Sequence, residues 1–419
     1  MVILLDLDGT ITNTVHPGWK AYKDGISFYP VDNIPFFDGA IDFIQHRRNR
    51  GDKLLIVSDS HPNFVIPIAE KLNLPALSLC NKPNTNKLRV FLNENNVLPN
   101  EPILFVGDST LDVELGRRIG ARTAWLLPYH ITEEIVNVQD GIGDTMSCVK
   151  MGPTYSIKTY HELNQIIESP NENLYVAESL HLGSTSIRPI VFSENSRVDG
   201  TCSSIYCLGR QEQGLCDDAA IASLYYEMQR KDRSEATVNL LAKSVSFFLN
   251  QDCFSRQNWD YLSYINDKTT TIPKNKLKDI FEKIETRFEK KELFYWGKEI
   301  DGSLRKRESY TERRTFLENN LSVKDIMQIA GKNIIVLDDQ LTTGATAWFV
   351  IQKLKDAGAK NIMFIAIFQM ILNVFSEKHC PICGKQLYIK INRTNGKRFY
   401  SCLSPVYGGN GCGHIENII

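Results

Sequence analysis

The chain has 419 residues, which is too long for one ordinary hydrophobic core, so we expect two or three domains. Its 42% hydrophobic and 23% charged residues are typical of a soluble globular protein, and a net charge of −1 excludes binding to nucleic acid through overall charge. Asp6 and Asp8 interrupt the first apolar run, which argues against a signal peptide, and the longest apolar stretch is too short to span a bilayer. We therefore expect a cytoplasmic protein without a membrane partner.

Residues 1–169 are predicted to form one doubly wound α/β domain. Buried strands are expected in "VILLDLD", "DKLLIVSDS", "EPILFVGDS" and "RTAWLL", and an amphipathic stretch follows or precedes each of them. Buried strands that alternate with helices are typical of a parallel sheet with helices on both faces. The polar, proline-containing segment at 170–174 is the best candidate for a linker.

Two carboxylates follow the first predicted strand in "DLDGT", at the edge where open α/β sheets bind their ligands. Asp6 has the position of a nucleophile that attacks phosphorus, and Asp8 that of an acid that protonates the leaving oxygen. Carboxylates this close repel each other, and a bound Mg²⁺ would relieve the repulsion.

Three later segments supply the remaining groups that phosphoryl transfer needs. Ser58 in "VSDS" offers a hydroxyl to a phosphoryl oxygen, and Lys82 in "NKPN" offers a cation. Asp108 and Asp112 in "VGDSTLD" offer further metal ligands. Together these strand ends form a constellation suited to phosphoryl transfer.

These motifs, in this order, resemble those of the haloacid dehalogenase (HAD) superfamily of Mg²⁺-dependent phosphohydrolases over residues 1–168. The resemblance implies that Asp6 is the nucleophile and Asp8 the acid/base, and that Ser58 and Lys82 bind phosphate. It also implies a set of Mg²⁺ ligands: Asp6, Asp8 through its carbonyl, Asp108 and Asp112. The alternative is an inactive domain with chance acids at its strand ends. The segment 11–37 is short for the cap that many HAD enzymes carry there, which predicts an open site that admits bulky substrates.

Residues 175–375 are predicted to form a second α/β domain. Amphipathic helices are expected in "CDDAAIASLYYEMQR" and "EATVNLLAKSVSFFLN", and strands in "WDYLSYI", "NIIVLDD" and "NIMFIAIF". A helix that ends at Gly358 lies between the last two strands. This order again favours a doubly wound, mostly parallel sheet.

A second acidic motif, "DDQLTTGAT", follows the apolar run that ends at Leu337. Asp338 and Asp339 stand at the predicted strand end, where they are placed to contact ribose hydroxyls and a bound Mg²⁺. The next residues present hydroxyls and backbone N–H groups at the start of a helix, which suits a 5′-phosphate. They are Thr342, Thr343, Gly344, Ala345 and Thr346. An acidic turn followed by a threonine helix cap is the alternative.

This motif resembles the signature of type I phosphoribosyltransferases, and residues 200–370 resemble their ComF-like branch through "SIYCLGR", "YEMQRKDR", "YTERR" and "KLKDAGAKNI". The resemblance implies that the domain binds phosphoribosyl pyrophosphate (PRPP) with Mg²⁺. It also implies that "LRKRESYTERR" is a mobile basic loop, for which a solvated charge run is the alternative. The loop "NDKTTTIPKNK" departs from the family's pattern, which favours PRPP binding over a standard transfer reaction.

Residues 378–419 contain four cysteines with the spacing of a metal site, C-x2-C followed after 18 residues by C-x9-C. Four thiolates suit a closed, structural Zn²⁺ site, and here they are Cys380, Cys383, Cys402 and Cys412. The segment resembles the C-terminal zinc ribbons of type IA topoisomerases. Its basic residues interleave with aromatic ones, which favours single-stranded nucleic acid as a partner. A ribbon that docks a protein or is purely structural is the alternative.

Two functions fit these predictions. The first is a Mg²⁺-dependent phosphohydrolase combined with a PRPP-binding, phosphoribosyltransferase-type domain, which acts on a phosphorylated small molecule or a nucleic-acid end. The second is a nucleic-acid-associated effector or accessory protein in DNA processing, DNA uptake or phage defence. In that case the second domain senses PRPP or a nucleotide without turnover, and protein partners are expected.

Overall fold

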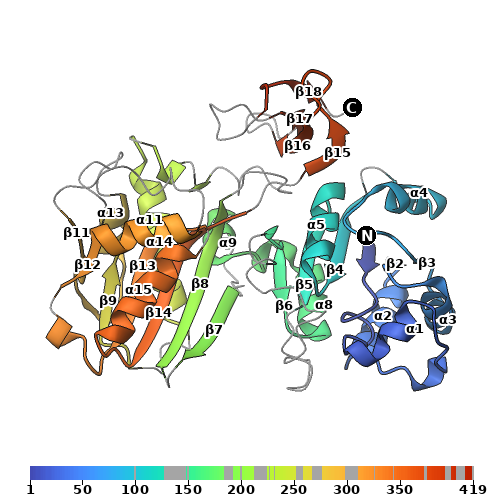
Figure 1. Cartoon of the computed structure of the whole chain (residues 1–419), viewed down its shortest axis with the longest axis horizontal. Coiled ribbons are helices and arrows are strands. Elements are labelled where there is room, and N and C mark those ends of the chain that lie inside the picture. Colours follow the sequence, from blue (N-terminus) through green and yellow to red (C-terminus); the bar gives the residue numbers. More distant parts are fainter. Residues whose placement is uncertain are drawn as a thin grey trace. The chain divides into compact units, whose positions relative to one another are not determined.

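The computed structural model divides into two compact units, built on residues 1–170 and 171–371, and we describe the tail after residue 372 by itself (Figure 1). The structure describes residues 1–98, 101–126, 148, 151–183, 192–198, 201–211, 224–225, 227–230, 232–251, 258–266, 276–297, 310–324, 326–342, 344–371, 375–391, 398–402 and 411–417. Among these residues, no helix combines the length and the apolar character that a membrane crossing needs.

The first unit contains a six-stranded parallel sheet with the strand order β3-β2-β1-β4-β5-β6. Its strands are β1 (Val2–Leu5), β2 (Lys53–Val57), β3 (Ala76–Leu77), β4 (Ile103–Gly107), β5 (Arg122–Leu126) and β6 (Tyr155–Ile157). Four helices of the described residues connect these strands, α2 (Ala40–Asn49), α3 (Pro62–Leu72), α4 (Asn86–Glu94) and α5 (Thr110–Ile119), and α8 (Tyr160–Glu168) follows β6. The predicted parallel α/β sheet is therefore confirmed.

Apolar strands make β1 the buried centre of this sheet. All four of its residues are inaccessible to solvent, and β1 pairs with β2 on one side and β4 on the other. One face, with Val2 and Leu4, packs against Leu88 and Phe91 of α4 and Leu115 of α5. Because β1, β2 and β4 are adjacent and parallel, the residues that follow them lie at one edge of the sheet.

A segment of irregular structure connects β1 to α2. It contains the short helices η1 (Pro17–Trp19), α1 (Lys20–Lys23) and η2 (Val31–Asn33). Its two ends are tied together, since Asn13 N donates to Pro35 O over 2.9 Å and Phe37 N donates to Ile11 O over 3.0 Å. The segment therefore begins and ends beside the strand edge that follows β1.

The second unit contains a six-stranded sheet with the order β10-β9-β13-β14-β8-β7, parallel except for the antiparallel pair β7–β8. Its strands are β7 (Phe192–Val198), β8 (Thr201–Gln211), β9 (Tyr261–Tyr264), β10 (Glu289–Lys290), β13 (Asn333–Leu341) and β14 (Asn361–Met370). A separate antiparallel pair consists of β11 (Phe294–Trp296) and β12 (Leu321–Val323). The helices are α9 (Val176–His181), α11 (Glu235–Leu249), α13 (Lys276–Lys283), α14 (Tyr310–Asn320), η6 (Ile326–Gln328) and α15 (Ala345–Asp356).

Helices cover both faces of this second sheet. Ile335 and Leu337 of β13 belong to a core shared with α11 and α13, whereas Ile334 and Val336 belong to a core shared with α15. Alternate residues of a strand point to opposite faces, so this division is what a sheet buried on both sides requires. The doubly wound arrangement predicted for this part of the chain is therefore present.

A buried ion pair attaches α9 to the second sheet. Arg210 of β8 donates from Nε and Nη2 to the two carboxylate oxygens of Glu178, both over 2.9 Å. The Arg210 guanidinium also lies over the ring of Tyr175, 5.4 Å from its centre. The chain just before α9 contains a short helix, η4 (Pro170–Glu172), within the segment predicted as the linker.

The tail forms a four-stranded antiparallel sheet in sequence order, with β15 (Phe375–His379), β16 (Gln386–Ile391), β17 (Arg398–Ser401) and β18 (Ile415–Asn417). Its small core consists of Leu387 with Cys380 and Cys402, against which Tyr400 packs. So few buried side chains provide little stabilisation, and a unit of this size usually depends on a metal or disulfides.

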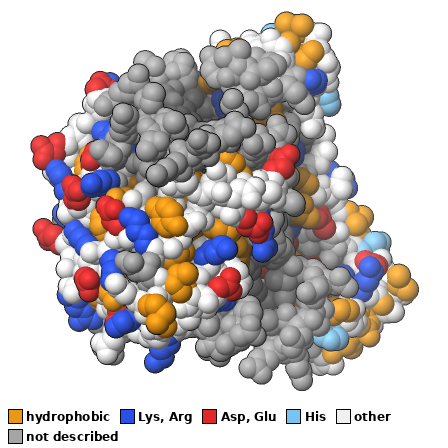
Figure 2. Space-filling model, turned by 60° about the vertical axis from the view of Figure 1, so that its left-hand side comes forward, with side chains coloured by type: hydrophobic (Ala, Val, Ile, Leu, Met, Phe, Trp, Pro, Cys, Tyr) orange, Lys and Arg blue, Asp and Glu red, His pale blue; other side chains and the backbone are white. Residues whose placement is uncertain are grey.

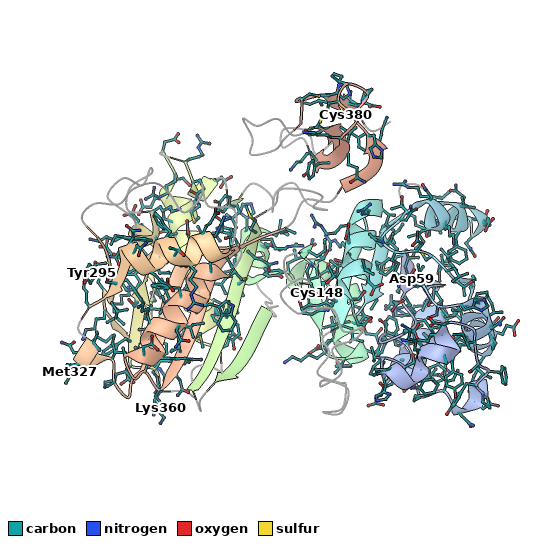
Figure 3. The ribbon with its side chains drawn as sticks, in the orientation of Figure 1. Asp59, Cys148, Tyr295, Met327, Lys360 and Cys380 are labelled. Atoms are coloured by element: carbon teal, nitrogen blue, oxygen red, sulfur yellow. The ribbon has the colours of Figure 1, made fainter. Side chains whose placement is uncertain are left out.

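Acidic and basic side chains are intermixed on the side of the second unit that Figure 2 turns toward the viewer. Hydrophobic side chains lie among them. The exposed apolar residues of this unit include Tyr295, Ile326 and Met327, and Met327 is 92% exposed (Figure 3).

Candidate functional site

Three carboxylates meet at the strand edge of the first unit. Asp6 follows β1, Asp108 follows β4, and Asp112 lies in the first turn of α5. Carboxylate oxygens of all three lie within 4.8 Å of one another, and the three residues are 6%, 5% and 1% exposed. The structure therefore brings together three of the four residues predicted to serve a Mg²⁺ site.

Lys82 is the cation of this cluster. Its ammonium group forms ion pairs with Asp6 and, over 2.7 Å, with Asp112. Burial would lower the pKa of Lys82, but Asp112 and Asp6 outweigh that effect and raise it well above its usual range. Lys82 therefore stays charged, in the position where a phosphoryl group would need a counter-ion.

One ammonium group does not balance three buried carboxylates. Burial, and then the charge of Asp112, raise the pKa of Asp108 to about 8. Burial also raises the pKa of Asp6, against the opposing effect of Lys82. Without a further cation the cluster must therefore hold protons near neutral pH.

Asp8, the fourth residue predicted to serve the Mg²⁺ site, accepts hydrogen bonds from two hydroxyl groups. Thr14 Oγ1 donates to Asp8 Oδ1 over 2.7 Å, and Ser60 Oγ donates to Asp8 Oδ2 over 2.6 Å. Thr12 Oγ1 lies 2.8 Å from Thr14 Oγ1 and extends the network. The Asp8 carboxylate is thus held in one orientation, close enough for its charge to contribute to the raised pKa of both Asp6 and Asp108.

The sequence analysis missed Thr14 and Ser60. Thr14 lies four residues beyond the quoted motif "DLDGT", and Ser60 is the last residue of "VSDS". A hydroxyl residue close in the chain to a predicted acid is the signal that would have pointed to Thr14. Ser60 is 52 residues from Asp8, and only the fold brings the two together.

Ser58 follows β2, on the strand adjacent to β1, and is 1% exposed. Its Oγ accepts the backbone N–H of Ser60 over 3.1 Å, so its own proton remains available for donation to a ligand. Asp59, the next residue, accepts the backbone N–H of Lys82 over 2.9 Å and so fixes the loop that carries the cation (Figure 3).

Gly9 makes the close approach of two strand ends possible. Its φ is +78°, and a Cβ atom there would lie 2.2 Å from Asp108 Oδ2. Only glycine fits both the left-handed backbone and the short distance. The glycine of "DLDG" thus allows the first acidic loop to lie against Asp108.

The donor set fits Mg²⁺. This ion binds carboxylate oxygens and usually keeps several waters, so it is commonly held by one or two carboxylates and a phosphate group. Asp6 and Asp108 would hold it, with Asp112 oriented beside them by Ser109, whose Oγ and backbone N–H donate to Asp112 Oδ2 over 2.6 and 3.0 Å.

A second pair of acids lies on β13 of the second unit. Asp338 is 8% exposed, and burial followed by the neighbouring Asp339 raises its pKa well above the usual range. Asp339 forms an ion pair with Lys276, the first residue of α13. Lys276 was not predicted, although it is the last residue of the departing loop "NDKTTTIPKNK".

The residues after this pair begin helix α15. Gly344 precedes the helix with a φ of +78°, and Ala345 and Thr346 form its first turn. Thr342 Oγ1 accepts a hydrogen bond from Arg313 Nη1 of α14 over 2.6 Å. Thr343 lies outside the described residues.

One prediction for this region was wrong, and another is contradicted in part. The strand was expected to end at Leu337, but β13 continues through Leu341, since Gln340 and Leu341 still pair with β14. The acids therefore lie within the strand rather than after it. Of the predicted basic loop, residues 310–314 belong to helix α14, while residues 304–309 lie outside the described residues.

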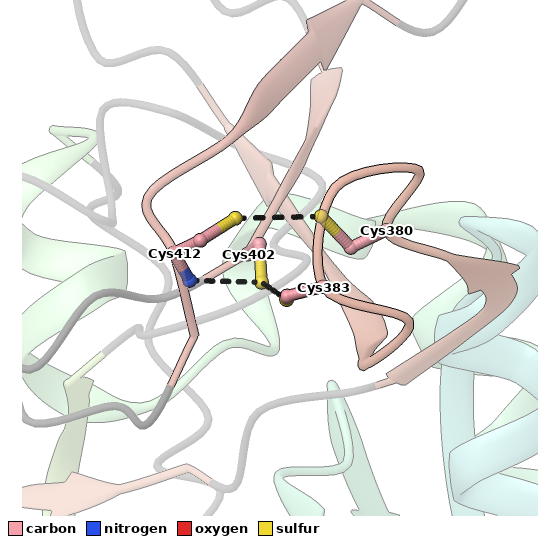
Figure 4. A group of neighbouring side chains, drawn as sticks. All are labelled: Cys380, Cys383, Cys402 and Cys412. Atoms are coloured by element: carbon pink, nitrogen blue, oxygen red, sulfur yellow. Dashed lines mark hydrogen bonds between the residues drawn. The ribbon is translucent and has the colours of Figure 1, made fainter.

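The four cysteines of the tail converge on one point (Figure 4). All four Sγ atoms lie within 4.8 Å of one another, with Cys380 and Cys412 at 3.5 Å and Cys383 and Cys402 at 3.4 Å. A tetrahedral Zn²⁺ with Zn–S bonds of about 2.3 Å places its sulfurs about 3.8 Å apart. The set therefore fits a closed Zn²⁺ site, which has no open position for catalysis.

Two knuckles with the same hydrogen bonds support these cysteines. Cys380 O accepts from Gly384 N over 2.9 Å, and Cys402 O accepts from Gly413 N over 2.8 Å. Both glycines have positive φ, +71° and +83°. Despite the longer gap between Cys402 and Cys412, the two knuckles therefore share this hydrogen bond and this glycine conformation.

Basic and aromatic residues of the tail are paired with each other. Lys378 lies 5.2 Å from the ring centre of Tyr400, and Lys390 lies 5.8 Å from that of Tyr388. Lys378 also forms an ion pair with Glu416, which offsets part of its charge. Tyr407, a further aromatic residue of the tail, lies outside the described residues.

Comparisons with known proteins complete the description. The sequence matches no protein-family model and no curated protein. Among solved structures it is similar to a HAD-superfamily hydrolase from Ehrlichia chaffeensis, with 15% identity, 40% of this chain and 94% of that chain covered, and a TM-score of 0.28. A predicted phosphoglycolate phosphatase from Haemophilus somnus 129PT is 14% identical, with 40% of this chain and 97% of that chain covered and a TM-score of 0.30. A predicted phosphatase from Clostridium acetobutylicum is 16% identical, with 40% of this chain and 98% of that chain covered and a TM-score of 0.31. We base the functional proposal on the side chains of the site.

The charge of the first cluster predicts how stability depends on pH. Because burial raises the pKa of Asp108 to about 8, the folded protein binds more protons than the unfolded chain between about pH 4 and pH 8. Without Mg²⁺, the free energy of unfolding of the first unit should fall by about 5 kcal/mol as the pH rises through this interval, at ~1.4 kcal/mol for each unit by which the pKa is raised. Bound Mg²⁺ should make this decrease in the free energy of unfolding smaller. Urea unfolding at several pH values, with and without Mg²⁺, measures the free energy of unfolding.

Asp108→Asn should make this pH profile shallower, whereas Asp38→Asn, which removes an exposed carboxyl of the same unit, should leave it unchanged. Coinciding profiles for Asp108→Asn and the wild type would contradict the raised pKa.

The cysteine cluster predicts one bound Zn²⁺ per chain. Cys402→Ser should abolish it and increase amide hydrogen exchange in β16 and β17, because the small core of the tail cannot hold those strands alone. Zinc stoichiometry and hydrogen exchange measure both effects. Cys148→Ser removes a buried thiol outside the cluster and should keep the metal. Retention of a full equivalent of Zn²⁺ in Cys402→Ser would contradict the assignment.

Proposed function

We propose that the first unit is a HAD-type, Mg²⁺-dependent phosphohydrolase that works through an aspartyl-phosphate intermediate on Asp6. The observation that carries the proposal is the contact of Lys82 with both Asp6 and Asp112 inside a buried carboxylate cluster at the carboxyl ends of parallel strands. A buried lysine between carboxylates is expected where a phosphoryl group and a cation are bound together.

The chemistry follows from the placement of each side chain. A carboxylate oxygen of Asp6 attacks phosphorus, the bond between phosphorus and the ester oxygen breaks, and Asp8 donates a proton to that oxygen. Water then attacks the phosphorus of the aspartyl phosphate while Asp8 takes its proton, which releases phosphate and regenerates Asp6. Lys82 and Ser58 stabilise the phosphoryl oxygens throughout. Bound Mg²⁺ would neutralise charge on the phosphoryl group.

In this proposal, Thr14 and Ser60 position Asp8, the acid/base. They hold the Asp8 carboxylate in one orientation through hydrogen bonds of 2.7 and 2.6 Å. The proposal therefore gives these two hydroxyl groups a positioning role for Asp8 in both steps.

We further propose that the second unit binds PRPP or a nucleotide. Support comes from Asp338 and Asp339 beside the loop that begins α15, where Gly344 and backbone N–H groups suit a phosphate. The ion pair between Asp339 and Lys276 favours binding without turnover, because a cation already offsets the charge that a reacting ribose would require.

The proposed combination has a place in nucleotide or nucleic-acid metabolism. The phosphohydrolase would be the active part, and the second unit would either act in the same sequence of reactions or sense PRPP or nucleotide as part of an effector in DNA processing, uptake or defence. The tail would contact single-stranded nucleic acid or a protein partner. The free cysteines among the described residues fit the reducing cytoplasm.

Asp6→Asn tests the phosphohydrolase. The rate of phosphate release with Mg²⁺ should fall by about 1,000-fold or more, because an amide oxygen is a poor nucleophile. Release from ribose 5-phosphate, nucleotides and phosphorylated oligonucleotides measures it. Asp38→Asn serves as the matched control at an exposed position. Undiminished release from Asp6→Asn preparations would reveal a contaminating enzyme and overturn the proposal.

Replacement of Asp338 and Asp339 tests the second unit. Either change to Asn should weaken binding of PRPP in the presence of Mg²⁺ by about 10-fold or more, as expected for loss of a charged hydrogen-bond partner. Isothermal titration calorimetry measures the binding, and Asp356→Asn, at an exposed position of α15, is the control. Binding by the wild type without consumption of PRPP supports a sensor, and consumption supports an enzyme. No binding at all would sink the proposal.

A further inference from the structure

Three aromatic rings pack together in the segment between β1 and α2, which we call the platform (residues 16–30). The Trp19 ring lies 4.6 Å from that of Tyr29 and 5.8 Å from that of Tyr22, and Tyr22 and Tyr29 are 5.1 Å apart, all between ring centres. Tilted and edge-on contacts of this kind hold aromatic rings in fixed orientations. The platform is therefore a built surface although it contains only short helices.

The platform is attached directly to the first site. Lys23 O accepts the backbone N–H of His61 over 2.7 Å, and His61 follows Ser60, whose hydroxyl contacts Asp8. Gly25 also lies against His61, since a Cβ atom at Gly25 would be 2.4 Å from His61 Nδ1. One residue of extended chain spans about 3.5 Å, so the contact between Lys23 and His61 lies within about 10 Å of the Asp8 carboxylate.

Two large apolar side chains of the platform are exposed to solvent. Ile26 and Phe28 are each 78% exposed, whereas Val15 and Ile34 at the two ends of the segment are buried. Lys20, in the same segment, is exposed as well. An exposed aromatic ring and an exposed lysine on a segment attached to a phosphate site are suited to a base that stacks and a phosphate that pairs with the cation.

We propose that the platform binds the last nucleotides of a single-stranded nucleic acid whose terminal phosphate occupies the site at Asp6, with Phe28 stacked on a base and Lys20 against an adjacent phosphate. This inference rests on the proposed phosphohydrolase function. A sugar phosphate has no aromatic base to stack on Phe28, and a mononucleotide has no second backbone phosphate for Lys20. The chemistry of the platform thus favours a strand end over either small molecule.

The test compares three substrates for the full-length protein with Mg²⁺: ribose 5-phosphate, a nucleoside monophosphate, and a short single-stranded oligonucleotide with a terminal phosphate. Phe28→Ala should lower kcat/KM for the oligonucleotide by about 5- to 100-fold, the range for loss of one base-stacking contact, and leave ribose 5-phosphate unchanged. Phe28→Tyr keeps the ring and should retain most of the activity. Val90→Ala, at an exposed apolar position of α4, is the matched control.

Lys20→Ala tests the second contact. The dependence of the oligonucleotide KM on salt should become weaker, with the slope against log salt concentration smaller by about 0.7, the change expected when one phosphate contact to a single strand is lost. Arg50→Ala is the control, because Arg50 is exposed and precedes β2 at the opposite edge of the sheet.

Each result decides one question. Equal effects of Phe28→Ala on all three substrates, or none on any, overturn the platform and leave the phosphohydrolase standing. A Phe28-dependent preference shared equally by mononucleotide and oligonucleotide overturns the assignment to a strand end. A dimer that Phe28→Ala converts to monomers, with no effect on turnover, assigns the surface to a second copy and also overturns it. No Asp6-dependent release from any substrate is the separate failure of the proposed function.

Discussion

The buried charge at the edge of the first sheet is the constraint on which the site depends. Parallel strands β1, β2 and β4 are adjacent, so the groups that follow them are forced to one edge, and there Asp6, Asp108 and Asp112 share a single ammonium group from Lys82. Three carboxylates and one lysine would leave two uncompensated negative charges in a place with little access to water, and such charges are not tolerated without protons or a cation. A proton on Asp108 offsets part of this charge only below about pH 8, to which burial raises its pKa. A divalent cation would offset the charge at higher pH, so the fold creates a demand for a cation at this edge.

The second unit meets a similar demand in a different way. Its two acids are consecutive residues of one strand, and Lys276 reaches Asp339 from the start of α13. One lysine for two carboxylates leaves a single uncompensated charge, and the raised pKa of Asp338 allows a proton to remove it. The second pair thus needs a metal ion less than the first cluster does. The hydrogen bond from Arg313 to Thr342 joins the loop before α15 to a neighbouring helix, so this unit is organised before any ligand binds.

Much of the fold was predictable from the sequence because its strands are apolar and its helices amphipathic, and motif order placed the acids of the first site. The short strands β3 and β6, with two and three residues, carry too little periodicity to be recognised. Ser60 and Lys276 were missed because their partners, Asp8 and Asp339, are 52 and 63 residues away in the chain, and only the fold brings them together. The end of β13 was misplaced because acids were taken to terminate the strand, whereas backbone pairing with β14 continues through them. The cysteine spacing was the most informative local signal, since a tetrahedral site requires all four thiolates.

The short connection between β1 and α2 determines what kind of reaction the first site favours. A large cap excludes water when it closes, which protects reactive intermediates and permits transfer to other acceptors. Here the connection is tied at both ends and forms a small aromatic surface beside the acid/base. A connection this short does not form a large cap, which agrees with a proposed function of hydrolysis rather than transfer to another acceptor. Under that proposal, Asp8 is oriented by residues of the domain itself, because Thr14 and Ser60 hold its carboxylate through hydrogen bonds. These hydrogen bonds form within the first unit and need no part of a cap.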